Sequence, residues 1–364
     1  MYNHTMAGIA IANRRLVIGC VVLALAVCLG YFWWSSLATP SRDTLVALLP
    51  GDSEAAIFVD LGELQQSPFF TDLLDWAPKQ DVDAEYRRFV SDTHFNYETD
   101  LQRVAVAFQE QDGQQFILAI GDGRFDQKKI QAYGTRINEN QKRGEPEIFL
   151  VPAAAQRKTI FFTFLRKDRI AITNGKDFKP LLELSKSGDR DDWQTRFKRV
   201  AGSPLFAVIR NDGLKEILGN QSPANGSTPR TIGGLTSPQL SSLLEQLQWV
   251  TIAGKPENDE LRTVVEGESS DDVHARQLAD MVNGILVLAR AGLSGAKAGS
   301  ATRSSYLALL KSAQVSQIDR GETKSVRLIF SVTPQLLKSA EMAAPGGSNA
   351  PPAPNNSTPR RQAN

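Results

Sequence analysis

The sequence predicts an α+β protein with two similarly built halves, each an antiparallel β-sheet with helices packed on one face, preceded by one transmembrane helix. Three observations predict this architecture. Residues 16–34 carry no charge, the strands that follow are mostly joined as hairpins, and the order strand, helix, hairpin, helix, hairpin, helix occurs twice. The composition is suited to a folded core, since 41% of the 364 residues are hydrophobic and 22% are charged.

The apolar run is long enough to cross a membrane. A helix over residues 16–34 would measure roughly 28 Å at 1.5 Å per residue, which matches the hydrocarbon core of a bilayer. An aromatic pair at its end suits the membrane interface. The side chains that we expect to anchor the protein include Leu16, Leu23, Leu25, Trp33 and Trp34.

The flanking charges predict the orientation of this helix. Arg14 and Arg15 precede it, and a single Arg42 follows, so residues 1–15 should stay in the cytoplasm. The inner (cytoplasmic) membrane would then hold the protein, with the folded region in the periplasm or outside the cell. The alternative is a signal peptide cleaved after Ala38, which would release a secreted protein.

The first half, residues 44–188, follows a short linker at 35–43. Ser67 and Asp126 are expected to cap helices, and residues 111–114 and 167–168 should form hairpin turns. We expect strands at 55–60, 103–109, 115–121, 159–165 and 169–173, and helices at 68–76, 84–92, 126–140 and 177–184.

The second half, residues 189–343, repeats this order. Ser270 and Asp271 are expected to cap an amphipathic helix, and Thr333 is expected to cap the last helix. We expect strands at 204–209, 249–253, 261–266, 314–318 and 326–332, a helix at 213–218, and an apolar stripe of Leu278, Met281, Val282, Ile285, Leu286 and Ala289 on the helix after Asp271. Residues 219–237, 292–302 and 344–364 have the composition of disordered segments.

Several chemistries are excluded by composition. The two cysteines, Cys20 and Cys28, lie inside the apolar run, so the folded region has no disulfide and no thiolate ligand. A net charge of +1 gives no long-range field for nucleic acid. Only His94 and His274 remain for imidazole chemistry, and neither has a partner at metal-ligand spacing. We therefore expect no cofactor, no metal and no catalytic residue.

Three short motifs are better explained as turns and caps. Residues 51–53, Gly-Asp-Ser, resemble part of a serine hydrolase block but precede the first strand, where a Pro-Gly-Asp turn accounts for them. Residues 121–126 contain too few carboxylates for a calcium loop. Asp189, Asp191 and Asp192 lie where the start of a helix favours negative charge.

Basic and aromatic residues of the second half also have structural explanations. Arg196, Lys198 and Arg199 follow the acidic residues at 189–192, and the mixture indicates a solvated helix surface. Each tryptophan of the folded region lies beside apolar neighbours, which favours core packing over a ligand platform. These residues are Trp76, Trp193 and Trp249.

Residues 48–69, LLPGDSEAAIFVDLGELQQSPF, resemble the opening of bacterial envelope proteins with one N-terminal anchor, in the group that carries domain of unknown function 3352. Asp100-Leu101 before a strand and residues 123–126 before a helix fit this resemblance. It implies an α+β repeat in the periplasm or outside the cell, and it implies no activity.

The expected function is non-enzymatic binding of an envelope protein or other envelope component by a domain tethered to the bilayer. The alternative is a carrier of an apolar ligand or lipid, in a cavity lined by Phe161, Phe162, Phe164 and the stripe from Leu278 to Leu286. A hydrolase is the third reading. Nucleic acid is not an expected partner, and the sequence predicts no oligomeric state.

Overall fold

The computed structural model describes residues 45–76, 84–111, 114–137, 147–153, 158–175, 181, 191–213, 247–269, 271–295, 301–321 and 323–343. The chain divides into two compact units, residues 1–47 and 48–364, and the elements below belong to the second. Among the described residues, no helix is both long and apolar enough to cross a membrane. The predicted anchor at 16–34 lies outside those residues.

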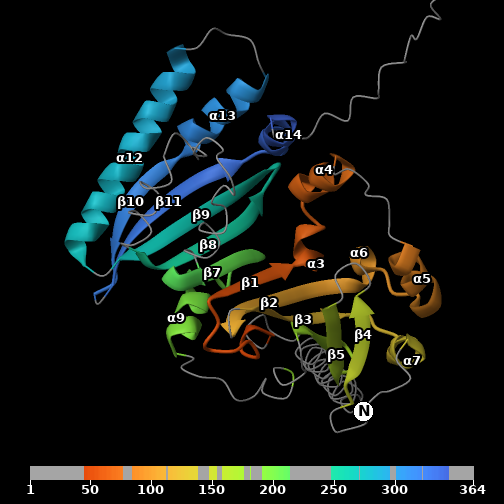
Figure 1. The fold of residues 1–364 in the computed structure, drawn as a ribbon. Coiled ribbons are helices and arrows are strands. Elements are labelled where there is room, and N and C mark those ends of the chain that lie inside the picture. The colour runs from red at the N-terminus through yellow and green to blue at the C-terminus, as the bar shows by residue number, and fades with distance from the viewer. Residues whose placement is uncertain are drawn as a thin grey trace, which may run out of the picture. The chain divides into compact units, whose positions relative to one another are not determined.

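Eleven strands form one antiparallel sheet in the order β10-β11-β9-β8-β7-β1-β2-β3-β6-β5-β4 (Figure 1). The strands are β1 Ala55–Asp60, β2 Leu101–Gln111, β3 Gln114–Gly123, β4 Phe149–Ala153, β5 Lys158–Arg166, β6 Arg169–Gly175, β7 Leu205–Arg210, β8 Leu247–Glu257, β9 Glu260–Ser269, β10 Gln314–Asp319 and β11 Lys324–Val332. Both predicted halves therefore share one sheet. They meet where β1 pairs with β7, and Phe58 stacks on Phe206 at 4.9 Å between ring centroids.

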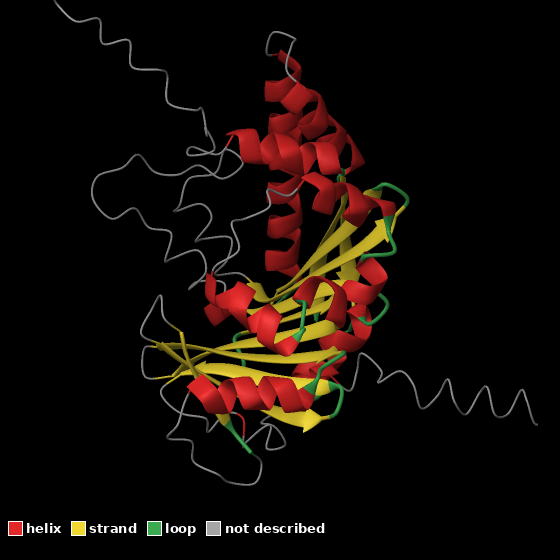
Figure 2. Ribbon diagram, turned by 90° about the vertical axis from the view of Figure 1, so that its right-hand side faces the viewer, coloured by secondary structure: helices red, strands yellow, loops and turns green. Residues whose placement is uncertain are grey.

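Helices accompany both ends of the sheet (Figure 2). Several begin at caps that the sequence predicts, since the side chains of Ser67, Asp126 and Thr333 accept from backbone N–H groups of the first turn. The helices are α3 Leu61–Leu64, α4 Pro68–Trp76, α5 Ala84–Thr93, α6 Tyr97–Asp100, α7 Gln127–Ile137, α9 Asp191–Val200, α12 Asp272–Gly295, α13 Ala301–Ser312 and α14 Pro334–Ala343.

Three parts of the sequence-based assignment need correction. Strand β4 was not predicted because Pro152 interrupts its short apolar run, and an edge strand tolerates proline. Helix α13 was not predicted either. The disordered insertion expected at 292–302 is too long, because α12 continues to Gly295 and α13 begins at Ala301. The predicted helices at 177–184 and 213–218 and the loop at 219–237 lie largely or wholly outside the described residues.

The helices are not confined to one face of the sheet, contrary to the prediction. Leu278 of α12 belongs to a core cluster with Val250 of β8 and Val326 of β11. Phe197 of α9 instead contacts Phe206 of β7, with 5.7 Å between ring centroids. Because alternate residues of a strand point to opposite faces, the strand registers place α9 on the face opposite α12.

The apolar cavity expected between Phe162 and the stripe of α12 is not formed. Phe162 lies on β5 and packs with Ile130 of α7 and Phe149 of β4. The α12 stripe packs over β8, β9 and β11. Six strands lie between β5 and β9 in the sheet, which makes seven steps of the usual strand spacing, or about 34 Å. These two apolar groups form separate cores at opposite ends of the sheet.

Candidate functional site

Helix α9 carries two arginines that turn toward the sheet. Its sequence is DDWQTRFKRV, in which residues three or four apart share one helix face. Trp193 anchors this face, since it is buried and meets Trp249 of β8 edge-on at 5.0 Å. Arg196 and Arg199, three and six residues further on, are therefore held over the sheet.

Two glutamates of β9 lie under these arginines. Glu266 and Glu268 are two residues apart, so they point to the same face, which is the face that α9 covers. Both are buried, and Glu268 has a side-chain exposure of only 1%. Isolated buried carboxylates are strongly disfavoured, so partners are required.

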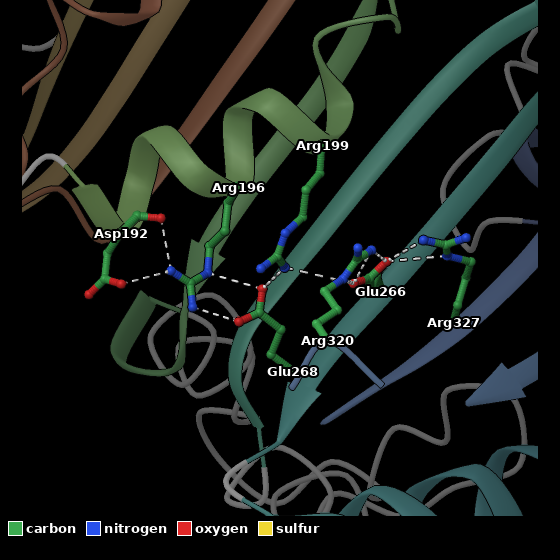
Figure 3. Close-up of polar contacts among 7 residues, drawn as sticks. All are labelled: Asp192, Arg196, Arg199, Glu266, Glu268, Arg320 and Arg327. Carbon is green, nitrogen blue, oxygen red and sulfur yellow. Dashed lines mark hydrogen bonds and ion pairs between the residues drawn. The ribbon is translucent and has the colours of Figure 1, made fainter. Parts of the chain in front are cut away.

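Glu268 is held by both arginines of α9 (Figure 3). Arg196 donates from Nε to Oε1 at 3.1 Å and from Nη2 to Oε2 at 2.5 Å, and Arg199 donates from Nη1 to Oε1 at 2.6 Å. Arg196 also donates to the backbone carbonyl of Asp192 at 2.8 Å, and its guanidinium lies 4.0 Å from the ring centre of Trp249. This arginine is enclosed, with a side-chain exposure of 6%.

Glu266 is held from the other side by the last hairpin of the chain (Figure 3). Arg320 donates from Nε at 2.9 Å and from Nη2 at 3.0 Å, and Arg327 donates from Nη2 at 2.9 Å. Burial alone would raise the pKa of Glu266, but the hydrogen bonds from these two arginines hold the pKa below its ordinary value. Arg199 Nη1 lies 3.8 Å from Glu266 and links the two carboxylates.

We call Arg196, Arg199, Arg320 and Arg327, with the two glutamates, the arginine cluster. Four positive charges surround two buried negative charges, and among the described residues the exposed carboxylate of Asp192, which pairs with Arg196, offsets part of the excess. The side chains of Arg199, Arg320 and Arg327 are 20%, 28% and 31% exposed. Within the described residues, Nη1 of Arg320 and Arg327 and Nη2 of Arg199 donate to no acceptor.

Two buried hydroxyl groups lie next to the cluster without a partner. Thr251 is opposite Glu266 on β8, and Ser325 is opposite Glu268 on β11. Neither hydroxyl oxygen makes a hydrogen bond within the described part of the chain. Buried hydroxyls without partners are uncommon in native proteins. The two hydroxyl groups therefore add unused hydrogen-bonding capacity to that of the guanidinium groups.

The sequence analysis missed this site. It assigned Arg196 and Arg199 to a solvated surface, which is wrong because Arg196 is buried and Arg199 largely so. Glu266 and Glu268 follow a typical alternation for a strand facing solvent. The available signal was the matching spacing of the two pairs, since the glutamates are two residues apart on a strand and the arginines three apart on a helix. The sequence does not show that α9 packs on β9, because that contact is tertiary.

The first half holds a smaller buried ion pair. Asp122 of β3 accepts from Arg169 of β6 at 2.6 and 3.0 Å, and Arg103 of β2 lies 3.8 Å away. Asp122 belongs to the 121–126 motif. Because it pairs with an arginine of the neighbouring strand, its carboxylate has a structural role in the sheet. Asp126 caps α7, as the cap interpretation of that motif predicts.

An open cleft of about 880 Å³ lies at the start of α7. Its charged side chains mostly neutralise one another, as in the pairs of Asp100 with Arg124 at 3.1 Å and Asp126 with Lys129 at 3.5 Å. His94 lines the cleft and has a left-handed backbone, with φ of 60°. The cleft is a weaker candidate for a binding site than the arginine cluster, because it lacks the cluster's excess of hydrogen-bond donors.

The remaining predicted motifs occupy structural positions. Ser53 is buried and donates to the carbonyl of Pro50 at 2.7 Å, which confirms the turn at 51–53. His274 contacts Asp271, the cap of α12, at 2.6 Å. In the part of the chain that is described, no three His, Cys, Asp or Glu side chains gather closely enough to hold a metal ion.

No protein-family model matches the sequence, and no curated protein matches it. The fold has a low similarity to crystal structures of TP0453. Crystal form III gives a TM-score of 0.42 at 9% identity, over 81% of this chain and 96% of that chain. Crystal form I gives 0.40 at 10% identity, over 81% and 94%. The resemblance to the domain of unknown function 3352 group stays a prediction.

Proposed function

We propose that this protein is a non-enzymatic binding domain that docks an acidic segment of another envelope protein on the arginine cluster. A helix at residues 16–34 would hold it at the inner membrane with the sheet outside the cytoplasm. One observation carries the proposal: the cluster holds more guanidinium groups than its buried carboxylates need. Arg199, Arg320 and Arg327 keep partly exposed donors, and guanidinium groups recognise carboxylates through paired hydrogen bonds.

The state of the glutamates supports binding over acid–base catalysis. A general acid or base works best when its pKa lies near the working pH. The pKa of Glu266 is instead lowered by Arg320 and Arg327, and Glu268 accepts three guanidinium hydrogen bonds. Both carboxylates thus serve to position the arginines.

The test removes the excess charge and keeps the buried pairs. In the double variant Arg199→Gln, Arg327→Gln, Glu268 retains Arg196 and Glu266 retains Arg320, each through two hydrogen bonds. The full-length protein is crosslinked in its own membranes, recovered, and its partners are identified by mass spectrometry. We expect an acidic protein partner that is recovered with the native chain and lost with the double variant.

Arg262→Gln is the matched control. Arg262 lies on β9 and points to the same face, but it pairs with Glu257 in solvent at 3.5 Å. This variant should keep the partner, and raised salt should release it from the native chain. Equal recovery with the double variant and the native chain would refute the proposal, as would a partner with no acidic segment.

An apolar ligand remains a second candidate, at a different place from the one that the sequence analysis expected. On the α12 face, the central side chains Ile57, Val104 and Val106 are only partly buried. Their neighbours on the opposite face, such as Phe58 and Ala105, are fully buried. Displacement of a fluorescent fatty acid tests this reading, because Val106→Glu should abolish binding; unchanged binding would reject it.

We also propose that the two halves are a structural repeat. The order β1-β2-β3-β6-β5 in the first half corresponds to β7-β8-β9-β11-β10 in the second. A buried acid on the third strand pairs with an arginine on the fourth strand in both, as Asp122 with Arg169 and Glu266 with Arg327. If this proposal is right, an alignment of relatives in which the first half is matched to the second should place these two acid–arginine pairs at equivalent positions.

A further inference from the structure

The sheet has two edge strands, and within the described part of the chain only β4 carries a residue that protects its edge. β4 contains Pro152, which offers no N–H to an incoming strand. β10, with the sequence QVSQID, has no proline and no basic residue, and its single charge, on Asp319, pairs with Lys324 at 2.5 Å. Gln314, Ser316 and Gln317 are exposed. Natural sheets usually guard such edges with proline or charge, so an unguarded edge marks a contact surface.

The direction of each backbone group on β10 follows from two hydrogen bonds. Ser331 N–H donates to Ser312 Oγ at 3.0 Å, and Arg320 N–H donates to the Thr323 carbonyl at 3.1 Å. Since alternate residues of an antiparallel strand direct their N–H and C=O to the same side, the register makes Gln314, Ser316 and Ile318 the residues that bond to β11.

It follows that Val315, Gln317 and Asp319 direct their N–H and C=O groups away from the sheet. None of these three N–H groups bonds to another part of the described chain outside the sheet ladders. The outer rim of β10 is a short, regular row of donors and acceptors, which is what an added strand requires.

The arginine cluster borders this edge. Arg320 follows β10 directly, and Arg327 of β11 is opposite Ser316. Both guanidinium groups lie on the α9 face, which is also the face of Gln314, Ser316 and Ile318. A strand added to β10 would direct every second side chain to this face, beside an excess of positive charge.

We propose that β10 accepts an extended segment of the acidic partner protein as a twelfth strand, with acidic side chains at alternate positions on the α9 face. This inference rests on the proposed function and specifies how the partner is held. Backbone hydrogen bonds to Val315, Gln317 and Asp319 supply general affinity. The cluster then selects segments that carry carboxylates in register with Arg320 and Arg327.

The test uses the full-length protein and a fluorescent peptide that alternates Glu and Thr, with a Lys and Thr peptide as the charge control. Gln317→Pro removes one outward N–H and no bond to β11, whereas Gln317→Ala changes the side chain alone. Binding is followed by fluorescence anisotropy, and hydrogen exchange of the β10 amides is followed by mass spectrometry. We expect the Glu and Thr peptide to bind and to slow exchange in β10.

Gln317→Pro should weaken this binding by about tenfold or more and Gln317→Ala by no more than about twofold, with thermal unfolding of both variants close to native. Equal binding by the two variants, or binding without slower exchange in β10, would overturn strand addition. Suppose the peptide binds without strand addition and this binding is lost in the Arg199→Gln, Arg327→Gln variant. The proposed function then stands, and only the strand addition is rejected. A native protein that binds neither peptide also overturns the inference, and the membrane crosslinking result then judges the proposed function separately.

Discussion

Replacing Glu268 by Gln tests how the arginine cluster is held. The carboxylate is 1% exposed and accepts three hydrogen bonds from Arg196 and Arg199. The amide of Gln has one oxygen to accept and an NH₂ group that faces donors. An oxygen at the Oε1 position keeps the bonds from Arg196 Nε and Arg199 Nη1, and the bond from Arg196 Nη2 is lost together with the buried negative charge. Removing one partner of a buried ion pair costs about 3–5 kcal/mol.

Arg199 is 20% exposed and regains some hydration, which places the expected loss of unfolding free energy near the lower end, about 3–4 kcal/mol. At a urea slope of about 3 kcal/mol per molar, the midpoint should fall by about 1 M. Equilibrium unfolding followed by circular dichroism measures this shift.

Glu257→Gln is the matched control, because Glu257 pairs with Arg262 at the surface, where both side chains are about half exposed. An exposed pair contributes less than about 1 kcal/mol, so the urea midpoint of this variant should move by a few tenths of a molar at most. If Glu268→Gln and Glu257→Gln unfold at the same midpoint, the buried network contributes no net stability, and the reasoning fails.

Three further predictions follow from individual residues. Because the pKa of Glu266 is lowered on folding, its stabilisation is complete above the ordinary carboxyl pKa of about 4.3 and is lost as the pH falls through the lowered value. Urea unfolding at a series of acidic pH values should show the difference in unfolding free energy between the native protein and Glu266→Gln closing in that interval. A difference that stays constant with pH would contradict this prediction. Gly123→Ala would put a Cβ 2.5 Å from the carbonyl oxygen of Asp100 and should cost about 2–3 kcal/mol, whereas Gly202→Ala meets no atom within 4 Å and should change the unfolding free energy little. His94→Gly should raise the melting temperature by relieving a left-handed backbone, a gain of about 0.5–1 kcal/mol; a lower melting temperature would show that the histidine contacts outweigh the strain.

Local signals predicted most of the secondary structure. The strand at 55–60 has the observed bounds, because a short apolar run is bounded by a turn and a helix start. Ser67 and Thr333 each precede a proline at the first helical position, which defines the start of α4 and α14. These signals act within a few residues, so they are readable from one sequence.

The site required contacts that no local pattern contains. Glu268 is 72 residues from Arg196 in the chain, and Glu266 is 54 residues from Arg320. The alternation of residues along β9 shows that Glu266 and Glu268 share a face, but it does not distinguish a face exposed to solvent from one covered by a helix. The sharing of one sheet by both halves depends likewise on β1 pairing with β7, which was open at the sequence level.

That central pairing sets the order in which the protein can fold during synthesis. About 145 residues separate the end of β1 at Asp60 from the start of β7 at Leu205. At roughly 5–20 residues per second, the ribosome needs about 7–30 s to supply them. Throughout this interval the apolar strand AAIFVD stands at the margin of a partly made sheet. Nascent chains of the first half should therefore be clients of chaperones, and an isolated fragment that ends before β7 should self-associate through β1.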